Sequence, residues 1–547
     1  MALPPLFLAA LAFGAPYAAS LSLGFGGAAR DYLTLVTQAL PTLAFTLKQA
    51  ALSTLLALAL GLPGAWFLSS PGAPSPFRRF LRALSALPFA LPPILVVLGF
   101  ALFFGNSGWL NRALAALGWR NPPRILYRPE AVILAHGFYN FPLVLRLAGD
   151  SLEQARRAYL PAAATLGASP LRALFPILLP LCLPGIVCAA LLVFLYCFTS
   201  FAVVLILGGG PSASTLAVEI YRYARLSLDY GAAGILALAE TAVAAAVFLL
   251  YLVLAGRLDR ISTAADRNRP MAAKAASPLA LGVYALVMAL VVLGPILSIP
   301  LESLLRRASR AGRQEFSLYW WRIAGEGALP ALGRSLLLAF SAAALSCLLA
   351  VLANGAILAC GADSRADRGA GRGGRGGLLR TLLRIAAVSP LASSGIVLGL
   401  GWLVLYGREQ SRSFVSVALV HSVIALPFAF NSISQGLANL PPTVMAAGTV
   451  FGAGPLARIV TLALPIASGR LRSAWAFAAA ISLGELNAVM MLGMEGWETL
   501  PLFIYRAAGA YRYGAACAAG TLLILCCAAL FLLSDLAGPR PGGKGGR

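Results

Sequence analysis

Long apolar runs separated by short polar stretches dominate the chain. Each run is about 18–25 residues long, close to the roughly 20 residues that a helix needs to cross a bilayer. Alternating ten-residue segments, which are typical of outer-membrane barrels, do not occur. The pattern therefore predicts an all-α polytopic membrane protein with about twelve transmembrane helices. The runs fall at about 4–23, 48–70, 84–105, 131–148, 183–207, 232–256, 278–300, 335–358, 385–406, 414–432, 471–493 and 514–535.

The first apolar run has two interpretations. Ala18-Ala19-Ser20 is a passable cleavage region for a signal peptide. The run lacks a positively charged leading segment, which favours a helix that stays in the protein.

Composition and charge agree with a membrane protein. Of 547 residues, 60% are hydrophobic and 11% are charged, whereas soluble domains contain about 25% charged residues. The net charge of +23 could indicate nucleic-acid binding, but basic loops also orient helices and face anionic lipid headgroups. We therefore expect lipid contact and no nucleic-acid partner. The short Arg/Gly string at 372–377 is interpreted as a flexible linker.

The basic loops also predict an orientation in the bacterial (inner) membrane. Basic residues between 257 and 274, between 361 and 384, and in the C-terminal tail place both termini in the cytoplasm. The bias is weak, because basic stretches at 112–128 and 306–322 would then face outward.

Chemistry-bearing residues are sparse. The eight cysteines lie in or beside apolar runs without paired spacing, which is typical of packing residues rather than of disulfides or zinc ligands. With only two histidines and no set of His, Asp and Glu at helical spacing, the sequence predicts no metal site and no catalytic residues. A membrane-embedded enzyme is therefore poorly supported.

An internal repeat is the clearest feature of the sequence. Many short motifs recur after 285 residues, a spacing that slips only to 284 and 283 towards the end. We predict two tandem six-helix repeats, with residues 1–260 as the first, 261–277 as a cytoplasmic linker and 278–547 as the second. Because six is even, both repeats share one orientation, and a pathway is expected between the halves. Pairs at this spacing include His136 and His421, Pro142 and Pro427, Gly167 and Gly452, and Pro180 and Pro465.

Each repeat carries one long segment that is too polar for lipid, at 150–180 and at 435–465. Each segment is predicted to form a short helix, a glycine turn, a second short helix and a Leu-Pro step into the next span. Two small amphipathic helices at equivalent places are suited to binding a symmetric dimer.

These two segments resemble the EAA loop of binding-protein-dependent ABC importer permeases, Glu-Ala-Ala-x3-Gly-x9-Ile-x-Leu-Pro. The first copy has Pro161-Ala162-Ala163, Gly167 and Leu179-Pro180, and the second has Ala446-Ala447-Gly448, Gly452 and Leu464-Pro465. Both lack the leading Glu, while the spacing from Gly to Leu-Pro is intact. The resemblance implies the type I ABC importer permease (MetI-like) fold.

The resemblance extends over nearly the whole chain. Double-length permeases are found in the iron(III) and thiamine branches of the family. Segments around 197–211 and 482–505, together with Ala135-His136-Gly137-Phe138-Tyr139-Asn140, are similar to the thiamine (thiamine pyrophosphate) branch. The resemblance thus implies transport of thiamine or its phosphate esters by alternating access. An iron(III) or other small-solute permease of the same architecture is the alternative.

The resemblance also implies partners. In the family, the helix of the loop lies in a groove of a separate ATPase, so a homodimeric ABC ATPase is expected on the cytoplasmic side and a periplasmic or extracellular substrate-binding protein on the other. The sequence contains no Gly-x4-Gly-Lys-[Ser/Thr] motif, so the chain is expected to bind no cofactor and the partner to use ATP–Mg. The expected ATPase-coupling residues are Ala162, Ala163, Gly167, Ala168, Leu179, Pro180, Ala447, Gly452, Ala453, Leu464 and Pro465.

Polar and aromatic residues within the apolar runs are candidates for a substrate pathway. Glu485 is at the position equivalent to Ser200, and an intramembrane carboxylate is usually functional or paired. A carboxylate could meet the thiazolium cation, and aromatic rings could add cation–π contacts. The candidates are Ser200, Glu485, Asn487, Tyr139, Tyr196 and Trp402. The two histidines are interpreted as packing and hydrogen-bonding residues.

An ion-coupled secondary transporter is the rival from another class. Such carriers can also have six-plus-six parallel repeats. They would need no docking loops and would move substrate without ATP.

Overall fold

A computed structural model describes most of the chain as helix. The described residues are 13–23, 29–69, 76–82, 91–120, 124–169, 172–208, 210, 213–262, 277–307, 314–366, 375–438, 440, 442–494 and 496–537. The first half contains α2 (Ala15–Ser22), α3 (Ala29–Leu68), α5 (Pro93–Phe104), α6 (Trp109–Ala116), α7 (Pro129–Thr165), α8 (Leu179–Phe198), α9 (Ala202–Leu207), α10 (Leu216–Tyr221) and α11 (Tyr230–Ser262). The second half contains α12 (Pro278–Ser303), α13 (Tyr319–Ala366), α14 (Arg375–Val388), α15 (Gly395–Ser411), α16 (Phe414–Ala438), α17 (Pro442–Val450), α18 (Pro455–Arg458), α19 (Leu464–Ile466), α20 (Ser468–Gly484), α21 (Asn487–Leu492), α22 (Leu500–Gly509) and α23 (Tyr513–Ala537). Between α12 and α13, β1 (Leu305–Arg307) pairs antiparallel with β2 (Gln314–Phe316).

The helices confirm an all-α polytopic membrane protein. Within the described residues, nine helices are long and apolar enough to span a membrane, and a tenth candidate is a pair, Gly377–Ala392 and Gly395–Ser411, bent by 104°. These ten correspond to ten of the predicted runs. Most of the predicted run 4–23 lies outside the described residues, of which only 13–23 belong to it. The run 471–493 is not one helix, because the chain breaks between α20 and α21.

The helices form two compact units that differ from the predicted sequence repeats. One unit, here the first unit, is Gly27–Trp320, and the second unit combines Met1–Gly26 with Trp321–Arg547. Helix α12 begins the second predicted repeat but packs against α5 in the first unit, and α2 packs against α15 in the second unit. The predicted linker at 261–277 therefore does not coincide with a boundary between compact units. Residues 263–276 of that linker lie outside the described part of the chain.

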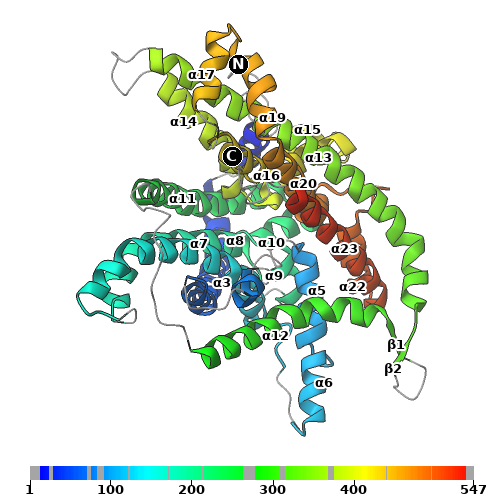
Figure 1. Cartoon of the computed structure of the whole chain (residues 1–547). Coiled ribbons are helices and arrows are strands. Elements are labelled where there is room, and N and C mark those ends of the chain that lie inside the picture. Colours follow the sequence, from blue (N-terminus) through cyan, green and yellow to red (C-terminus); the bar gives the residue numbers. More distant parts are fainter. Residues whose placement is uncertain are drawn as a thin grey trace. The chain divides into compact units, whose positions relative to one another are not determined.

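Within each unit, the helix that carries His136 or His421 has the largest buried fraction among the candidate membrane spans. In the most apolar window of each helix, 61% of residues are buried for α7 and 67% for α16, against 22% for α12. In the first unit α7 packs along α3 (Figure 1), and in the second α16 packs along α20. Small side chains on these faces let the helices approach closely. In a membrane such packing is driven by van der Waals contact, because lipid gives no hydrophobic driving force between helices.

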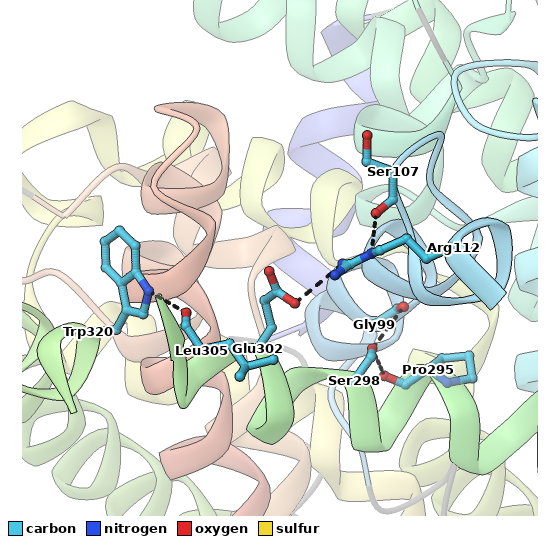
Figure 2. Close-up of polar contacts among 8 residues, drawn as sticks. All are labelled: Gly99, Ser107, Arg112, Pro295, Ser298, Glu302, Leu305 and Trp320. Carbon is cyan, nitrogen blue, oxygen red and sulfur yellow. Dashed lines mark hydrogen bonds and ion pairs between the residues drawn. The ribbon is translucent and has the colours of Figure 1, made fainter. Parts of the chain in front are cut away.

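Polar contacts attach α12 to the first unit (Figure 2). The Ser298 hydroxyl donates to the carbonyl of Pro295 on its own helix at 2.6 Å and lies 3.4 Å from that of Gly99 on α5. Nearer the end of α12, Glu302 pairs with Arg112 of α6 at 3.6 Å. Beyond the end of α12, the Trp320 indole N–H donates to the Leu305 carbonyl at 2.9 Å.

Glycine allows the closest approach of these helices. A Cβ added at Gly99 would overlap the carbonyl of Pro295, and one added at Gly401 of α15 would overlap the carbonyl of Pro16 in α2. Backbone atoms cannot move aside as a flexible side chain can. In each unit the additional helix therefore packs against a glycine: α12 against Gly99 in the first unit and α2 against Gly401 in the second.

We expect Gly99→Ala to destabilise the first unit by about 1–3 kcal/mol, the usual cost of overpacking a close contact. The thermal unfolding midpoint of the purified protein in detergent measures this. Gly282→Ala is the matched control on α12, because an added Cβ there meets nothing within 4 Å. Equal midpoints for the two variants would contradict the close α5–α12 contact.

Candidate functional site: two equivalent loops and two broken helices

The polar segment of the first unit contains a sharp turn at the end of α7. Gly167 has φ +77°, a left-handed conformation that glycine adopts without strain. The Gly167 N–H donates to the Ala164 carbonyl at 3.0 Å, and the Ala168 N–H donates to the Ala163 carbonyl at 3.0 Å. These two bonds form a Schellman motif, which satisfies carbonyls that the helix end would leave unpaired.

The second unit repeats this turn at the end of α17. Gly452 has φ +73°. Its N–H donates to the Thr449 carbonyl at 3.1 Å, and the Ala453 N–H donates to the Gly448 carbonyl at 2.9 Å. Each of these residues lies 285 positions after its counterpart in the first unit, so the sequence repeat is also a repeat of local structure.

The return from each turn is equivalent as well. A π-helical segment covers Leu174–Leu178 in the first unit and Ile459–Ala463 in the second, again 285 positions apart. Leu179-Pro180 then begins α8, and Leu464-Pro465 begins α19. Proline suits a helix start because its missing N–H would have no intrahelical partner there. Both copies thus have the predicted glycine turn and Leu-Pro step. The short helix predicted before the turn is a separate helix only in the second unit, as α17; in the first unit it is the end of α7.

The two turns also expose the same positions. Leu166 is 87% exposed, and its counterpart Phe451 is 86% exposed. Ala162 and Ala447 are exposed beside them. A Cβ added at Gly167 or Gly452 would meet nothing within 4 Å. On the inner side, Ala163 is buried in a small cluster with Leu160 and Ala173. Each loop therefore presents an apolar tip on a turn whose inner face is packed.

Each unit also has a broken helix, and Ser200 and Glu485 lie in the breaks. In the first unit α8 ends at Phe198 and α9 begins at Ala202. In the second unit α20 ends at Gly484 and α21 begins at Asn487, so α9 and α21 are also 285 positions apart. In transporters, broken helices expose backbone groups where a solute can contact them.

In the first unit, Ser200 belongs to a buried hydrogen-bond network. The His136 ring lies 2.8 Å from the Ser200 hydroxyl through Nε2 and 3.2 Å from the Gln49 side-chain oxygen Oε1 through Nδ1. Gln49 in turn donates to the Cys197 carbonyl at 2.8 Å, and Asn140 donates to the His136 carbonyl at 3.0 Å. Both nitrogens of His136 are thus occupied, which supports the packing and hydrogen-bonding interpretation.

In the second unit the equivalent histidine is held differently. His421 Nδ1 lies 2.8 Å from the Ser482 hydroxyl, whereas its buried Nε2 has no hydrogen-bond partner within the described residues. Glu485 accepts a hydrogen bond from the Ala488 N–H at 3.0 Å and so caps α21. A carboxylate at a helix N-terminus is favoured by the unpaired N–H groups there. Asn487, the first residue of α21, is partly buried.

The three aromatic candidates have different surroundings. Tyr139 donates to the Leu91 carbonyl at 3.2 Å and lines an apolar cleft with Phe100 and Pro295 in the first unit. Tyr196 is partly buried on α8. Trp402, in the second unit, is only 4% exposed and packs on Tyr406 with ring centroids 4.6 Å apart. Trp402 therefore has little free ring surface for a solute in this conformation.

Three polar residues near these sites were not among the site candidates of the sequence analysis. Gln49 and Asn140, which complete the His136 network, are 1% and 5% exposed, and Arg156 near the first loop is 2% exposed. A polar residue inside an apolar run is a usable signal for Gln49 and Asn140. Arg156 gave no such signal, because it lies in a segment rich in charges.

Comparisons with known proteins give relatives that match over most of this chain and most of their own length. A family model described as binding-protein-dependent transport system inner membrane component matches residues 57–261. The thiamine transport system permease protein ThiP of Brucella abortus (strain 2308) is 32% identical over 97% of this chain and 93% of that protein. ThiP of Escherichia coli (strain K12) is 27% identical over 84% and 82%. The spermidine/putrescine transport system permease protein PotB of Escherichia coli (strain K12) is 34% identical over 30% of this chain and 60% of that protein.

Proposed function

Because the chain belongs to the family of binding-protein-dependent transport permeases, we propose that it is the membrane subunit of an ATP-driven importer of thiamine or its phosphate esters. The observation that carries this proposal is the match to a thiamine transport system permease over 97% of this chain and 93% of that protein. A shared fold alone would not indicate a substrate. Here the likeness includes both halves of the chain.

The two polar loops are the proposed docking sites for the ATPase. They have the same turn, the same π-helical return and the same exposed tip, which suits two copies of one ATPase. Exposed apolar side chains on polar segments outside the lipid are typical of protein-binding sites. The coupling residues are those around Gly167 and Gly452. ATP–Mg is bound by the partner ATPase. Both loops and both termini of this chain lie in the cytoplasm.

An external substrate-binding protein completes the transporter. The family model describes components of transport systems that depend on such a protein. This chain supplies the membrane passage, and delivery of substrate to its outer face is the role of that partner.

The helix breaks are the proposed places where the chain contacts its substrate. Ser200 in the first unit and Glu485 in the second lie where α8 and α20 stop. The carboxylate of Glu485 is suited to a thiazolium cation, and Asn487 begins the next helix. Tyr139 and Tyr196 offer partly exposed rings in the first unit for stacking or cation–π contact.

Reconstitution tests the proposal directly. The purified chain, the ATPase and the binding protein encoded beside it are incorporated in proteoliposomes, and uptake of labelled thiamine is measured. We expect uptake only when ATP and the binding protein are both present. Uptake of iron(III) in place of thiamine would establish the alternative substrate, and uptake driven by an ion gradient without ATP would contradict an ABC importer.

A further inference from the structure

A buried arginine lies where the first docking loop leaves the helix bundle. Arg156 is on α7, nine residues before its end, and is 2% exposed. Its guanidinium carbon lies 3.7 Å from the ring centroid of Trp66, near the end of α3. The neighbouring Arg157 is partly exposed by contrast and pairs with Glu153 on the same helix. Arg156 and Trp66 are named here the Trp66–Arg156 clamp.

The clamp also contacts the part of the loop that returns to the bundle. Trp66 packs against a buried cluster of Leu152, Ala155, Leu178 and Cys182, and so does Leu174. Leu174 and Leu178 are the two ends of the π-helical segment that follows the first turn. The outgoing helix α7, the returning segment and the end of α3 therefore meet at one point.

In the second unit, the positions equivalent to the clamp hold residues without a ring or a guanidinium group. Thr46 of α3 accepts a hydrogen bond from the Leu216 N–H, and Ser335 of α13 accepts one from the Leu500 N–H, so these two helices correspond with an offset of 289 residues. Trp66 then corresponds to Gly355. Arg156 corresponds to Pro441 in the sequence repeat, with the offset of 285.

A different contact takes the place of the clamp in the second unit. A Cβ added at Gly355 would lie 3.1 Å from the Cδ1 of Ile459, the counterpart of Leu174. The returning segment therefore packs directly on the backbone of α13, without an aromatic ring between them. The two loops have the same turn but are attached to the bundle by different chemistry.

We propose that the Trp66–Arg156 clamp is a positioning element that fixes the first docking loop to α3 and transmits movement of the ATPase to the bundle. This inference rests on the proposed docking role of the loops. A guanidinium stacked on an indole is planar and directional, so it fixes the angle between two helices more tightly than aliphatic contacts do. Because the guanidinium is desolvated, the contact is strong and lasting. The two loops are then unequal in stiffness, and the first is the rigid one.

The test uses the complete transporter and two pairs of variants. Trp66→Leu and Arg156→Met remove the ring or the charge but keep apolar bulk, whereas Trp66→Phe and Arg156→Lys keep an aromatic ring or a cation. Arg157→Gln is the control, because it removes the neighbouring arginine, which is not part of the clamp. Co-purification of the ATPase, ATP hydrolysis stimulated by the loaded binding protein, and uptake are measured for each.

We expect Trp66→Leu and Arg156→Met to retain the ATPase but to lower uptake per ATP hydrolysed about tenfold. Trp66→Phe and Arg156→Lys should recover most of this loss, and Arg157→Gln should match the parent chain. The double variant that combines Trp66→Leu with Arg156→Met should lose no more uptake per ATP than either single variant. If Arg156→Met transports normally, or if Arg157→Gln is equally damaged, the clamp has no positioning role. If the parent chain itself does not bind the ATPase, the docking proposal fails and the clamp inference fails with it. Should Trp66→Leu not reach the membrane, the comparison of Arg156→Met with Arg156→Lys decides the matter.

Discussion

Replacing Leu166 and Phe451 together with glutamate is expected to abolish both ATPase co-purification and ATP-dependent uptake. The two side chains are 87% and 86% exposed at equivalent tips, so the change leaves the packed inner face of each loop intact. A charge placed in an apolar groove would have to be desolvated there, at a cost of several kcal/mol per ion. Affinity purification of the chain from membranes, with the ATPase measured in the eluate, checks this result.

The single variants and a control make this experiment specific. Leu117, which follows α6 and is 84% exposed, belongs to neither loop, so Leu117→Glu should leave binding unchanged. Leu166→Glu and Phe451→Glu each disable one of the two docking loops and should each weaken binding. Full ATPase recovery with the double variant would show that the loops do not form the docking surface.

The loops could be predicted because their structure is local. A glycine, a fixed interval and a Leu-Pro step determine the turn and its return, and the sequence carries them twice at one spacing. The two copies share the Schellman bonds at Gly167 and Gly452, although α7 continues unbroken into the first turn whereas the separate helix α17 leads into the second. Repetition in a sequence thus identified a feature that hydropathy alone would have left as a connecting loop.

The packing of α12 and α2 could not be predicted in the same way. An apolar run such as 278–300 indicates a helix but not which helix it contacts. The partner is selected by a close approach of glycine to backbone, between Gly99 and Pro295 in the first unit and between Gly401 and Pro16 in the second. Such pairs are far apart in the sequence and carry no periodic signal, so the sequence repeat does not indicate them.

Hydropathy also missed the break in the run 471–493 and the burial of Arg156. Apolar residues continue on both sides of Glu485, so the run resembles one span, whereas the carboxylate turns back to cap α21. Arg156 and Arg157 are neighbours in a charged segment, yet about 100° of helical rotation buries the first and leaves the second partly exposed. In both cases a tertiary contact decides what the local pattern leaves open.

Glu485→Gln is expected to lower the kcat/KM of thiamine uptake about tenfold, the effect of losing roughly 1.4 kcal/mol of cation–carboxylate attraction. Glutamine keeps a carbonyl oxygen that can accept the Ala488 N–H, so α21 retains its cap and only the charge is removed. The substitution therefore tests electrostatic recognition separately from folding. Initial rates in the reconstituted transporter, with saturating ATP and binding protein, give the measurement.

The charge of the substrate provides the decisive comparison for Glu485. An analogue with a neutral ring in place of the thiazolium lacks the cation, so its uptake should be equal in the parent chain and in Glu485→Gln. Glu498→Gln is the control within the same unit, because Glu498 pairs with Arg506 at 3.0 Å and is not in the break. If thiamine uptake is unchanged in Glu485→Gln, or if both substrates lose equally, Glu485 acts as a helix cap alone. A selective loss for the cationic substrate would instead show that the thiazolium charge is recognised at the break between α20 and α21. This is also the unit in which His421 Nε2 has no hydrogen-bond partner within the described residues.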